Sequence, residues 1–178
     1  DWKTLVNGVV ADKYDLTTSA SMNVARAKVA AFSEPWVAFG TVPMTLKANL
    51  PRFDGWSSID KADVTVAVTL GTVFDEQARA FFPNARIRAV EAPARDFQEV
   101  LAGRSLVSIT SNVEAASLIE TYPELVVIPV DAPKAVRPGA FLMDQRDQVW
   151  INFVDAWVRI NHANGFSAGL QRKWGLAQ

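Results

Sequence analysis

The chain has 178 residues, a hydrophobic fraction of 49% and a formal net charge of −1, which is enough apolar material for one sizeable core or two small lobes. It contains no run of Lys or Arg that would favour nucleic acid as a partner, and no apolar run near the roughly 20 residues that cross a bilayer. With no cysteine and one histidine, His162, a zinc site of Cys and His ligands is excluded. We expect neither a metal nor a cofactor.

The first elements place an arginine at the end of a strand. An amphipathic helix is predicted over Trp2–Ala11 and a short strand over Tyr14–Ala20. Small hydroxyl residues follow, and Asn23 is the predicted N-cap of a helical turn over Val24–Lys28. The guanidinium of Arg26 then lies beside hydroxyl and backbone N–H groups, an arrangement that suits a carboxylate. The alternative is a surface arginine after a capped turn.

The middle of the chain begins a strand–helix alternation. Extended structure is predicted over Val29–Phe32 and Trp36–Leu46, and the β-branched run Asp63–Leu70 is typical of a buried parallel strand. A tight turn, Gly71-Thr72, leads into a helix over Phe74–Phe82. In α/β folds such a turn presents the N–H groups of a helix N-terminus to an anionic ligand, although it is also a common structural connection.

The alternation continues to the second half of the chain, where an α/β fold with a parallel-rich sheet flanked by helices is predicted. The further strands are expected at 87–90, 106–110 and 125–130, and the further helices at 94–102 and 112–120.

The last part of the chain is predicted to contain a returning segment and two helices. Asp131–Gly139 leads back to a strand over Ala140–Met143, and helices follow over Val149–Ile160 and Phe166–Trp174. The first of these helices carries a broad apolar stripe that we assign to the core. The stripe consists of Trp150, Phe153, Val154, Trp157 and Val158.

The segment from Tyr14 to Trp36 resembles the ligand-binding segment of the type II periplasmic solute-binding proteins. These form the amino-acid-binding group of ABC transporters, bacterial extracellular solute-binding protein family 3, with cyclohexadienyl dehydratase-like members. The family reads Gly-Lys-Tyr-Asp, a strand, a Ser/Thr-rich turn, an Arg and Phe-Ser-Asp-Pro-Tyr. The counterparts here are Asp12-Lys13-Tyr14-Asp15, Thr18 to Ser21, Arg26 and Phe32-Ser33-Glu34-Pro35-Trp36. The likeness extends over nearly the whole chain.

The resemblance implies a two-lobe architecture. Residues 1–40 and 139–178 would form a partial first lobe, and residues 41–138 a complete second lobe. Measured against the family, roughly the first two strand–helix units of the first lobe have no counterpart. We therefore expect a processed, truncated or incomplete chain, whose precursor carries a signal peptide for export to the periplasm.

The resemblance also implies which residues bind the ligand. In the family the Arg clamps the ligand α-carboxylate with help from the preceding Ser and Thr residues, and a Gly-Thr turn of the second lobe contacts the same group. The family usually has a Thr three residues before the Arg, where this chain has Asn23. Carried over by position, the ligand-binding residues are Thr18, Ser19, Ser21, Arg26, Thr72 and Ser111.

Ser111 departs from the family pattern. Amino-acid-binding members usually have an aspartate at this position, where it binds the ligand ammonium. Ser111 can form a hydrogen bond but cannot neutralise a cation, and a buried ammonium without a counter-charge is costly. Either the ligand lacks an α-amino group, or Glu114 or another acid takes over. Ser111 as a simple helix cap is the structural alternative.

The leading functional hypothesis is a periplasmic binding protein, not an enzyme. It would close two lobes over an amino acid or related small carboxylate and deliver it to an ABC transporter permease in the membrane. The alternative is a cyclohexadienyl dehydratase-like carbon–oxygen lyase acting on prephenate or arogenate. Such an enzyme needs an acid to protonate the leaving hydroxyl, and Glu114 matches the Glu of the family's Thr-Asp-x-x-Glu segment. A sensor domain of the same fold would need a membrane-linked continuation.

Overall fold

The structure, a computed structural model, describes residues 2–174, except for the side chain of Ser19. The chain divides into two compact units, each described by itself below. Unit 1 consists of Asp1–Lys3 with Gly40–Ala135, and unit 2 of Thr4–Phe39 with Val136–Gln178. The chain passes between the units inside two long strands, β3 (Val37–Leu46) and β8 (Lys134–Met143). The boundaries predicted from the sequence fall after residues 40 and 138, whereas the units of the structure change after residues 39 and 135.

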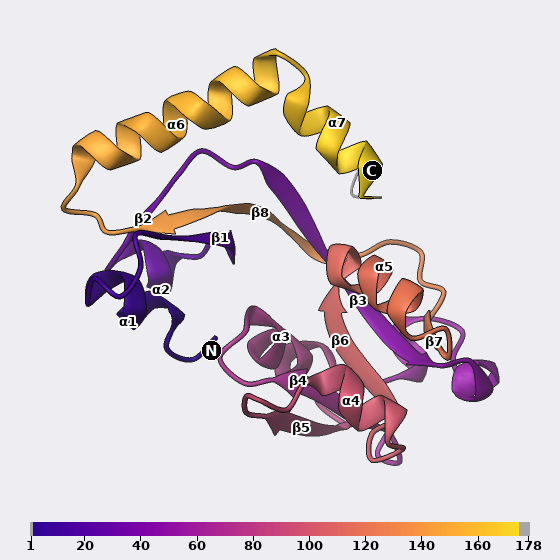
Figure 1. Ribbon diagram of the computed structural model, residues 1–178. Helices are drawn as coiled ribbons and strands as arrows, with labels where there is room; N and C mark the ends of the chain where they lie inside the picture. Colours follow the sequence, from indigo (N-terminus) through magenta and orange to yellow (C-terminus); the bar gives the residue numbers. More distant parts are fainter. Residues whose placement is uncertain (1, 175–178) are drawn as a thin grey trace. The chain divides into compact units, whose positions relative to one another are not determined.

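Unit 1 is built on a mixed sheet with a parallel centre (Figure 1). Its strands follow the order β3, β6 (Val107–Ser111), β4 (Thr65–Thr69) and β5 (Arg86–Val90), and β7 (Leu125–Val127) pairs with the far end of β3. The central strand β4 runs parallel to both β5 and β6, whereas β3 is antiparallel to β6 and β7. This arrangement confirms the predicted α/β class.

Helices cover both faces of this sheet. They are α3 (Val73–Phe81), α4 (Asp96–Leu101) and α5 (Asn112–Thr121), and the 3-10 helices η1 (Lys47–Arg52) and η2 (Trp56–Ser58) follow β3. Side chains alternate along a strand, so each face has its own core. Val66 and Val68 pack with Ala78 of α3, while Met44 on β3 packs with Val100 of α4. The carboxyl ends of β4 and β6 therefore meet helix starts at one edge, as in other α/β folds.

Unit 2 is a smaller layered structure. Strands β1 (Leu16–Ser21) and β2 (Ala31–Phe32) both pair antiparallel with β8. The helices are α1 (Leu5–Val10), α2 (Val24–Ala27), α6 (Gln148–Ala163) and α7 (Phe166–Lys173). Figure 1 shows α1 and α2 on one side of these strands and α6 on the other. On β8, Leu142 packs toward α1, and its neighbour Met143 packs against α6.

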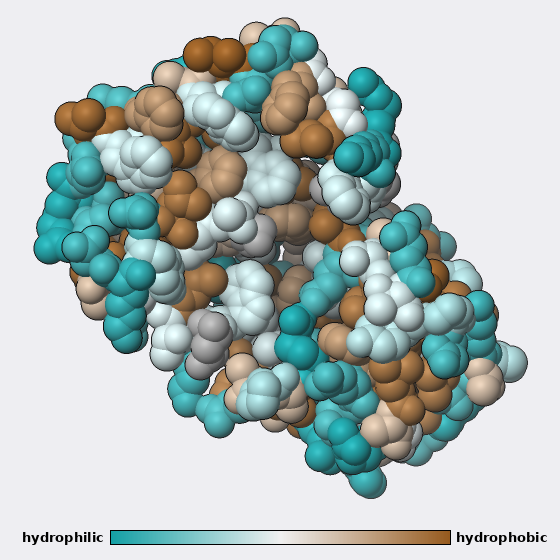
Figure 2. Space-filling view, viewed as in Figure 1, coloured by the Kyte–Doolittle hydropathy of each residue, from teal (hydrophilic) through white to brown (hydrophobic). Residues whose placement is uncertain are grey.

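The apolar stripe of α6 is only partly core, which corrects the prediction. Val154 and Val158 are buried, but Phe153 is 58% exposed and Trp157 is 43% exposed. The reason is that Val154 and Val158 pack with Met143 of β8, whereas Phe153 and Trp157 lie outside this buried cluster. Figure 2 accordingly shows hydrophobic side chains at the surface in the region of α6, at the top of the view.

Candidate functional site

Arg26 lies in a defined position in unit 2. Asn23 caps α2 as predicted, because its side-chain oxygen accepts a hydrogen bond from the Arg26 backbone N–H at 2.8 Å. The Arg26 guanidinium donates from Nη1 to the carbonyl oxygen of Ser21 at 3.1 Å, and the residue is only 9% exposed. Arg26 is therefore not a solvated surface arginine. Its charged group is held against the end of β1 by the Ser21 carbonyl.

The hydroxyl residues before Arg26 lie on a β-bulge. In the pairing of β1 with β8, Thr17 is opposite Leu142 and Ala20 is opposite Ala140, so two residues of β1 face one residue of β8. Bulges redirect side chains and are frequent beside functional sites. Thr18, in this bulge, is exposed, and its carbonyl oxygen accepts from Trp36 Nε1 at 3.2 Å.

The bulge also contains Ser19, whose side chain is outside the described part of the structure. Ser21 pairs with Gly139 at the end of β1, and its carbonyl holds Arg26. Of the predicted residues in unit 2, the structure thus brings Ser21 and Arg26 into direct contact.

Thr72 lies in the turn between β4 and α3 in unit 1. Gly71 before it has a φ of +81°, and a Cβ atom there would come within 2.8 Å of the Lys3 backbone, so the turn requires glycine. The Thr72 hydroxyl donates to the carbonyl of Thr69 at 2.6 Å and does not cap α3. With its proton so used, the hydroxyl oxygen remains an acceptor. The donors available to a carboxylate here are the first N–H groups of α3.

Ser111 and Glu114 lie at the junction of β6 and α5, on the same sheet edge. Ser111 Oγ accepts from the Glu114 backbone N–H at 3.0 Å, so Ser111 caps α5, and its hydroxyl proton can still donate. Both carboxylate oxygens of Glu114 are engaged. Oε1 forms an ion pair with Arg95 Nη2, and Oε2 accepts from the Thr110 hydroxyl.

Two charged residues of this edge, Arg95 and Asp96, are not among the site residues predicted from the sequence. Asp96 begins α4 and is 3% exposed, and its Oδ1 accepts from the Thr69 hydroxyl at 2.7 Å. The pKa of Asp96 is raised to about 6, mainly because the carboxyl is buried; the hydrogen bond from Thr69 and the charge of Arg95 oppose this rise, and the charge of Glu114 adds to it. The signal that could have found them is topological, because the segment after β5 reaches the same sheet edge as the turns after β4 and β6.

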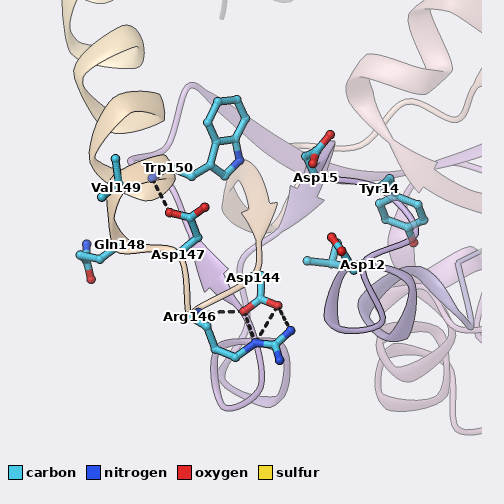
Figure 3. A pocket seen from close by; sticks show the side chains of 10 residues that line it. Asp12, Tyr14, Asp15, Asp144, Arg146, Asp147, Gln148, Val149 and Trp150 are labelled. Carbon is cyan, nitrogen blue, oxygen red and sulfur yellow. Dashed lines mark hydrogen bonds and ion pairs between the residues drawn. The ribbon is translucent and has the colours of Figure 1, made fainter.

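A cavity of about 880 Å³ in unit 2 does not contain the predicted residues (Figure 3). Two of its acidic groups, Asp144 and Asp147, already have partners within the unit. The Arg146 guanidinium, hydrogen-bonded to Asp144, holds the pKa of that carboxyl at about 2, and Asp147 caps α6 by accepting from the Trp150 N–H. Over residues 2–174, no group of three or more His, Cys, Asp or Glu side chains could hold a metal ion. We assign no ligand to this cavity.

Comparison with known proteins gives one family. The model of the bacterial extracellular solute-binding proteins, family 3, matches residues 1–177. A cyclohexadienyl dehydratase from Pseudomonas aeruginosa is 29% identical over 174 residues. That match covers 97% of this chain and 65% of the relative, so the chain spans about two thirds of its length.

Two solved structures illustrate the fold. The ancestral amino acid-binding protein AncCDT-1, a precursor of cyclohexadienyl dehydratase, has a TM-score of 0.86 and 28% identity, with 97% of this chain and 74% of that chain covered. An amino acid ABC transporter substrate-binding protein from Streptococcus pneumoniae, bound to L-arginine, has a TM-score of 0.86 at 17% identity, with 99% and 76% covered. The second likeness concerns the fold alone.

Proposed function

Because the chain belongs to the bacterial extracellular solute-binding proteins, family 3, we propose that it binds an amino acid or a related small carboxylate for an ABC transporter. The observation that carries this proposal is the buried guanidinium of Arg26, fixed by the Ser21 carbonyl beside a β-bulge. An arginine ordered before the ligand arrives loses less side-chain entropy on binding than a mobile one, which favours affinity.

The proposal assigns complementary chemistry to the two units. Arg26 takes the carboxylate through two parallel N–H donors. In unit 1, the Ser111 hydroxyl and the first N–H groups of α3 are donors, and the Thr72 hydroxyl oxygen is an acceptor. A ligand held by groups from both units would stabilise a closed state by its differential affinity, as hinge closure requires.

The ligand class follows from the same groups. Ser111 leaves the edge without the aspartate that would neutralise an α-ammonium, and both oxygens of Glu114 are already hydrogen-bonded. A carboxylate whose other polar group is a neutral N–H or O–H donor fits this edge, with the Thr72 oxygen as its acceptor. An amino acid fits only if an acid replaces the missing aspartate.

A dehydratase is the second candidate function, favoured by the likeness to a cyclohexadienyl dehydratase and by the position of Glu114. A general acid must deliver a proton to the substrate. Here both oxygens of Glu114 accept hydrogen bonds, from Arg95 and from Thr110, so neither oxygen is placed to donate to a substrate. This contact favours the binding protein over the enzyme.

The test screens the purified protein for binding by thermal shift and then by titration calorimetry. The probes are L-arginine, L-lysine and prephenate, a set that separates cationic amino acids from a ligand without an amino group. We expect at least one probe to bind with one-to-one stoichiometry. The absence of binding to all three, in a protein shown to be folded, would contradict the proposal.

Location and partner are part of the proposal. The family is extracellular, and we propose a periplasmic protein that delivers its ligand to a membrane permease. In the part of the chain that the structure covers, no helix combines the length and apolar character that crossing a membrane takes. Co-purification with the permease in a ligand-dependent manner would test the partner.

A further inference from the structure

Asp96 is an unusual residue for the place it occupies. Its carboxyl group is almost completely buried in unit 1, although carboxylates are seldom buried without a charged partner. One oxygen, Oδ1, accepts from Thr69. The other, Oδ2, is buried and has no hydrogen-bond partner among the described residues. A buried polar atom left unsatisfied has a cost in stability, and such atoms call for an explanation.

The charges around Asp96 do not remove this cost. The charge of Arg95 lowers the pKa of Asp96, but the Arg95 guanidinium forms an ion pair with Glu114. Glu114 acts in the opposite direction and raises that pKa. Among the described residues, Thr69 is the side chain that donates a hydrogen bond to Asp96.

Thr69 links Asp96 to the proposed binding turn. Its hydroxyl donates to Asp96 Oδ1 at 2.7 Å, while its carbonyl oxygen accepts from the Thr72 hydroxyl at 2.6 Å and from the Thr72 backbone N–H at 3.3 Å. Two steps of hydrogen bonding thus separate Asp96 from Thr72. The bond to Asp96 fixes the side-chain rotamer of Thr69, and the carbonyl of the same residue fixes the direction of the Thr72 hydroxyl.

We propose that Asp96 is a positioning residue for ligand binding. It orders the turn from Thr69 to Thr72, so that the Thr72 oxygen and the first N–H groups of α3 face the ligand in one fixed arrangement. Asp96 acts through Thr69 and does not itself touch the ligand. This inference rests on the proposed function, because it assigns a role to a residue that supports the same site.

The test compares two substitutions of Asp96. Asp96→Leu removes the acceptor of the Thr69 hydroxyl, whereas Asp96→Asn keeps an oxygen in its place. Affinity is measured by calorimetry with whichever of L-arginine, L-lysine and prephenate the wild-type protein binds most tightly. We expect Asp96→Leu to weaken binding about tenfold, as the loss of one ordering hydrogen bond does, and Asp96→Asn to stay within about threefold of wild type.

A matched control lies on the same helix. Glu99 of α4 is also a buried acid, but it pairs with Arg104 and Arg88 and has no part in the Thr69 link. Glu99→Gln should leave the affinity unchanged even if it lowers the melting temperature. A loss of affinity with Glu99→Gln equal to that with Asp96→Leu would mean that general destabilisation, not positioning, is measured, and the proposal would fall.

A double substitution tests whether Asp96 acts on the ligand site through Thr69. If Asp96 acts through Thr69, then Asp96→Leu combined with Thr69→Val should bind no more weakly than the weaker single variant, because both remove the same bond. Additive losses would overturn the proposal. If Asp96→Leu does not fold, Thr69→Val alone decides, with the same tenfold loss expected and an unchanged affinity as the contrary result.

A spectroscopic readout completes the test. The backbone amide of Thr72 should exchange with solvent at the wild-type rate in Asp96→Asn and faster in Asp96→Leu, and equal rates in the two variants would overturn the proposal. Wild-type protein that binds none of the three probes contradicts the proposed function itself. Wild-type binding that Asp96→Leu leaves intact contradicts only the role of Asp96.

Discussion

Glu114 and Arg95 form an ion pair at the carboxyl edge of the unit 1 sheet, and Thr110 donates to the second oxygen of the same carboxylate. Glu114 is the residue that a dehydratase would use as its acid. Its contacts instead keep both oxygens occupied as acceptors. This relationship separates the two candidate functions more sharply than the similarity to other proteins does.

The first prediction concerns turnover. Incubation of the wild-type protein with prephenate should give no phenylpyruvate absorbance above that of Glu114→Gln, because both oxygens of Glu114 are held as hydrogen-bond acceptors and not as donors to a substrate. Arg95→Met, which removes the ion pair, should lower the free energy of unfolding by less than about 1 kcal/mol, since both side chains are about one-third exposed. Turnover by wild type that disappears in Glu114→Gln would establish the enzyme instead.

The second prediction is a pH dependence of stability centred on Asp96. Its folded-state pKa is raised from 3.8 to about 6, mainly by burial, so the folded protein keeps this proton to a higher pH than the unfolded chain does. The free energy of unfolding should therefore fall as pH rises from about 4 to about 6. The rise of the pKa from 3.8 to about 6 corresponds to a loss of at most about 3 kcal/mol of unfolding free energy over this pH range.

Asp96→Asn should remove that pH dependence. The free energy of unfolding is measured with urea for both proteins at pH 4 and pH 7. Relative to the wild-type protein, the variant should be more stable at pH 7 than at pH 4 by up to about 3 kcal/mol. The neighbouring charges, Arg95 and Glu114, are present in both proteins and act as an internal reference. A difference independent of pH would contradict the assignment.

A third prediction concerns the glycine of the β4–α3 turn. Gly71→Ala should lower the free energy of unfolding by at least about 1 kcal/mol, because alanine is strained at a φ of +81° and its Cβ would meet the Lys3 backbone. Gly169→Ala in α7 is the control, since nothing lies within 4 Å of the added atom. That control should be neutral or stabilising by up to about 1 kcal/mol. If Gly71→Ala and Gly169→Ala changed the stability equally in thermal unfolding, the predicted backbone strain at position 71 would be refuted.

A fourth prediction uses two valines of one helix. Val158 in α6 is 1% exposed and packs against the β8 face, whereas Val149 is 81% exposed. Val158→Ala should cost about 2 kcal/mol of unfolding free energy, from lost burial and the cavity left behind. Val149→Ala should cost less than about 0.5 kcal/mol. Similar costs for both would mean that the burial of α6 is wrongly assigned.

The α/β class and the elements around the turns could be predicted from the sequence, because local patterns encode them. The β-branched run before Gly71 predicted a buried parallel strand, and β4 is one. Asn23 predicted a cap, and it is one. The exposure of Phe153 and Trp157 could not be predicted, because periodicity gives the direction of an apolar face but not the width of what covers it.

The contacts of the site depend on tertiary structure, so they were harder to predict from the sequence. Asp96 stands at a helix start, where an acid is typical and usually solvated, so its sequence position carried no sign of burial. The link to Thr69 joins residues 27 positions apart. The roles of Thr18, Ser19, Ser21, Thr72 and Ser111 toward a ligand stay predictions that binding measurements must test.

The most direct measurement is the affinity of Arg26 variants for the tightest-binding of L-arginine, L-lysine and prephenate. Arg26→Ala should abolish calorimetric binding, a loss of about 3–5 kcal/mol, because the ligand anion would be desolvated without its partner. Arg26→Lys should restore only part of it, since an ammonium lacks the planar fork. Arg159→Ala, which removes an exposed arginine paired with Glu34, should bind like wild type. Undiminished affinity in a folded Arg26→Ala protein would contradict the account.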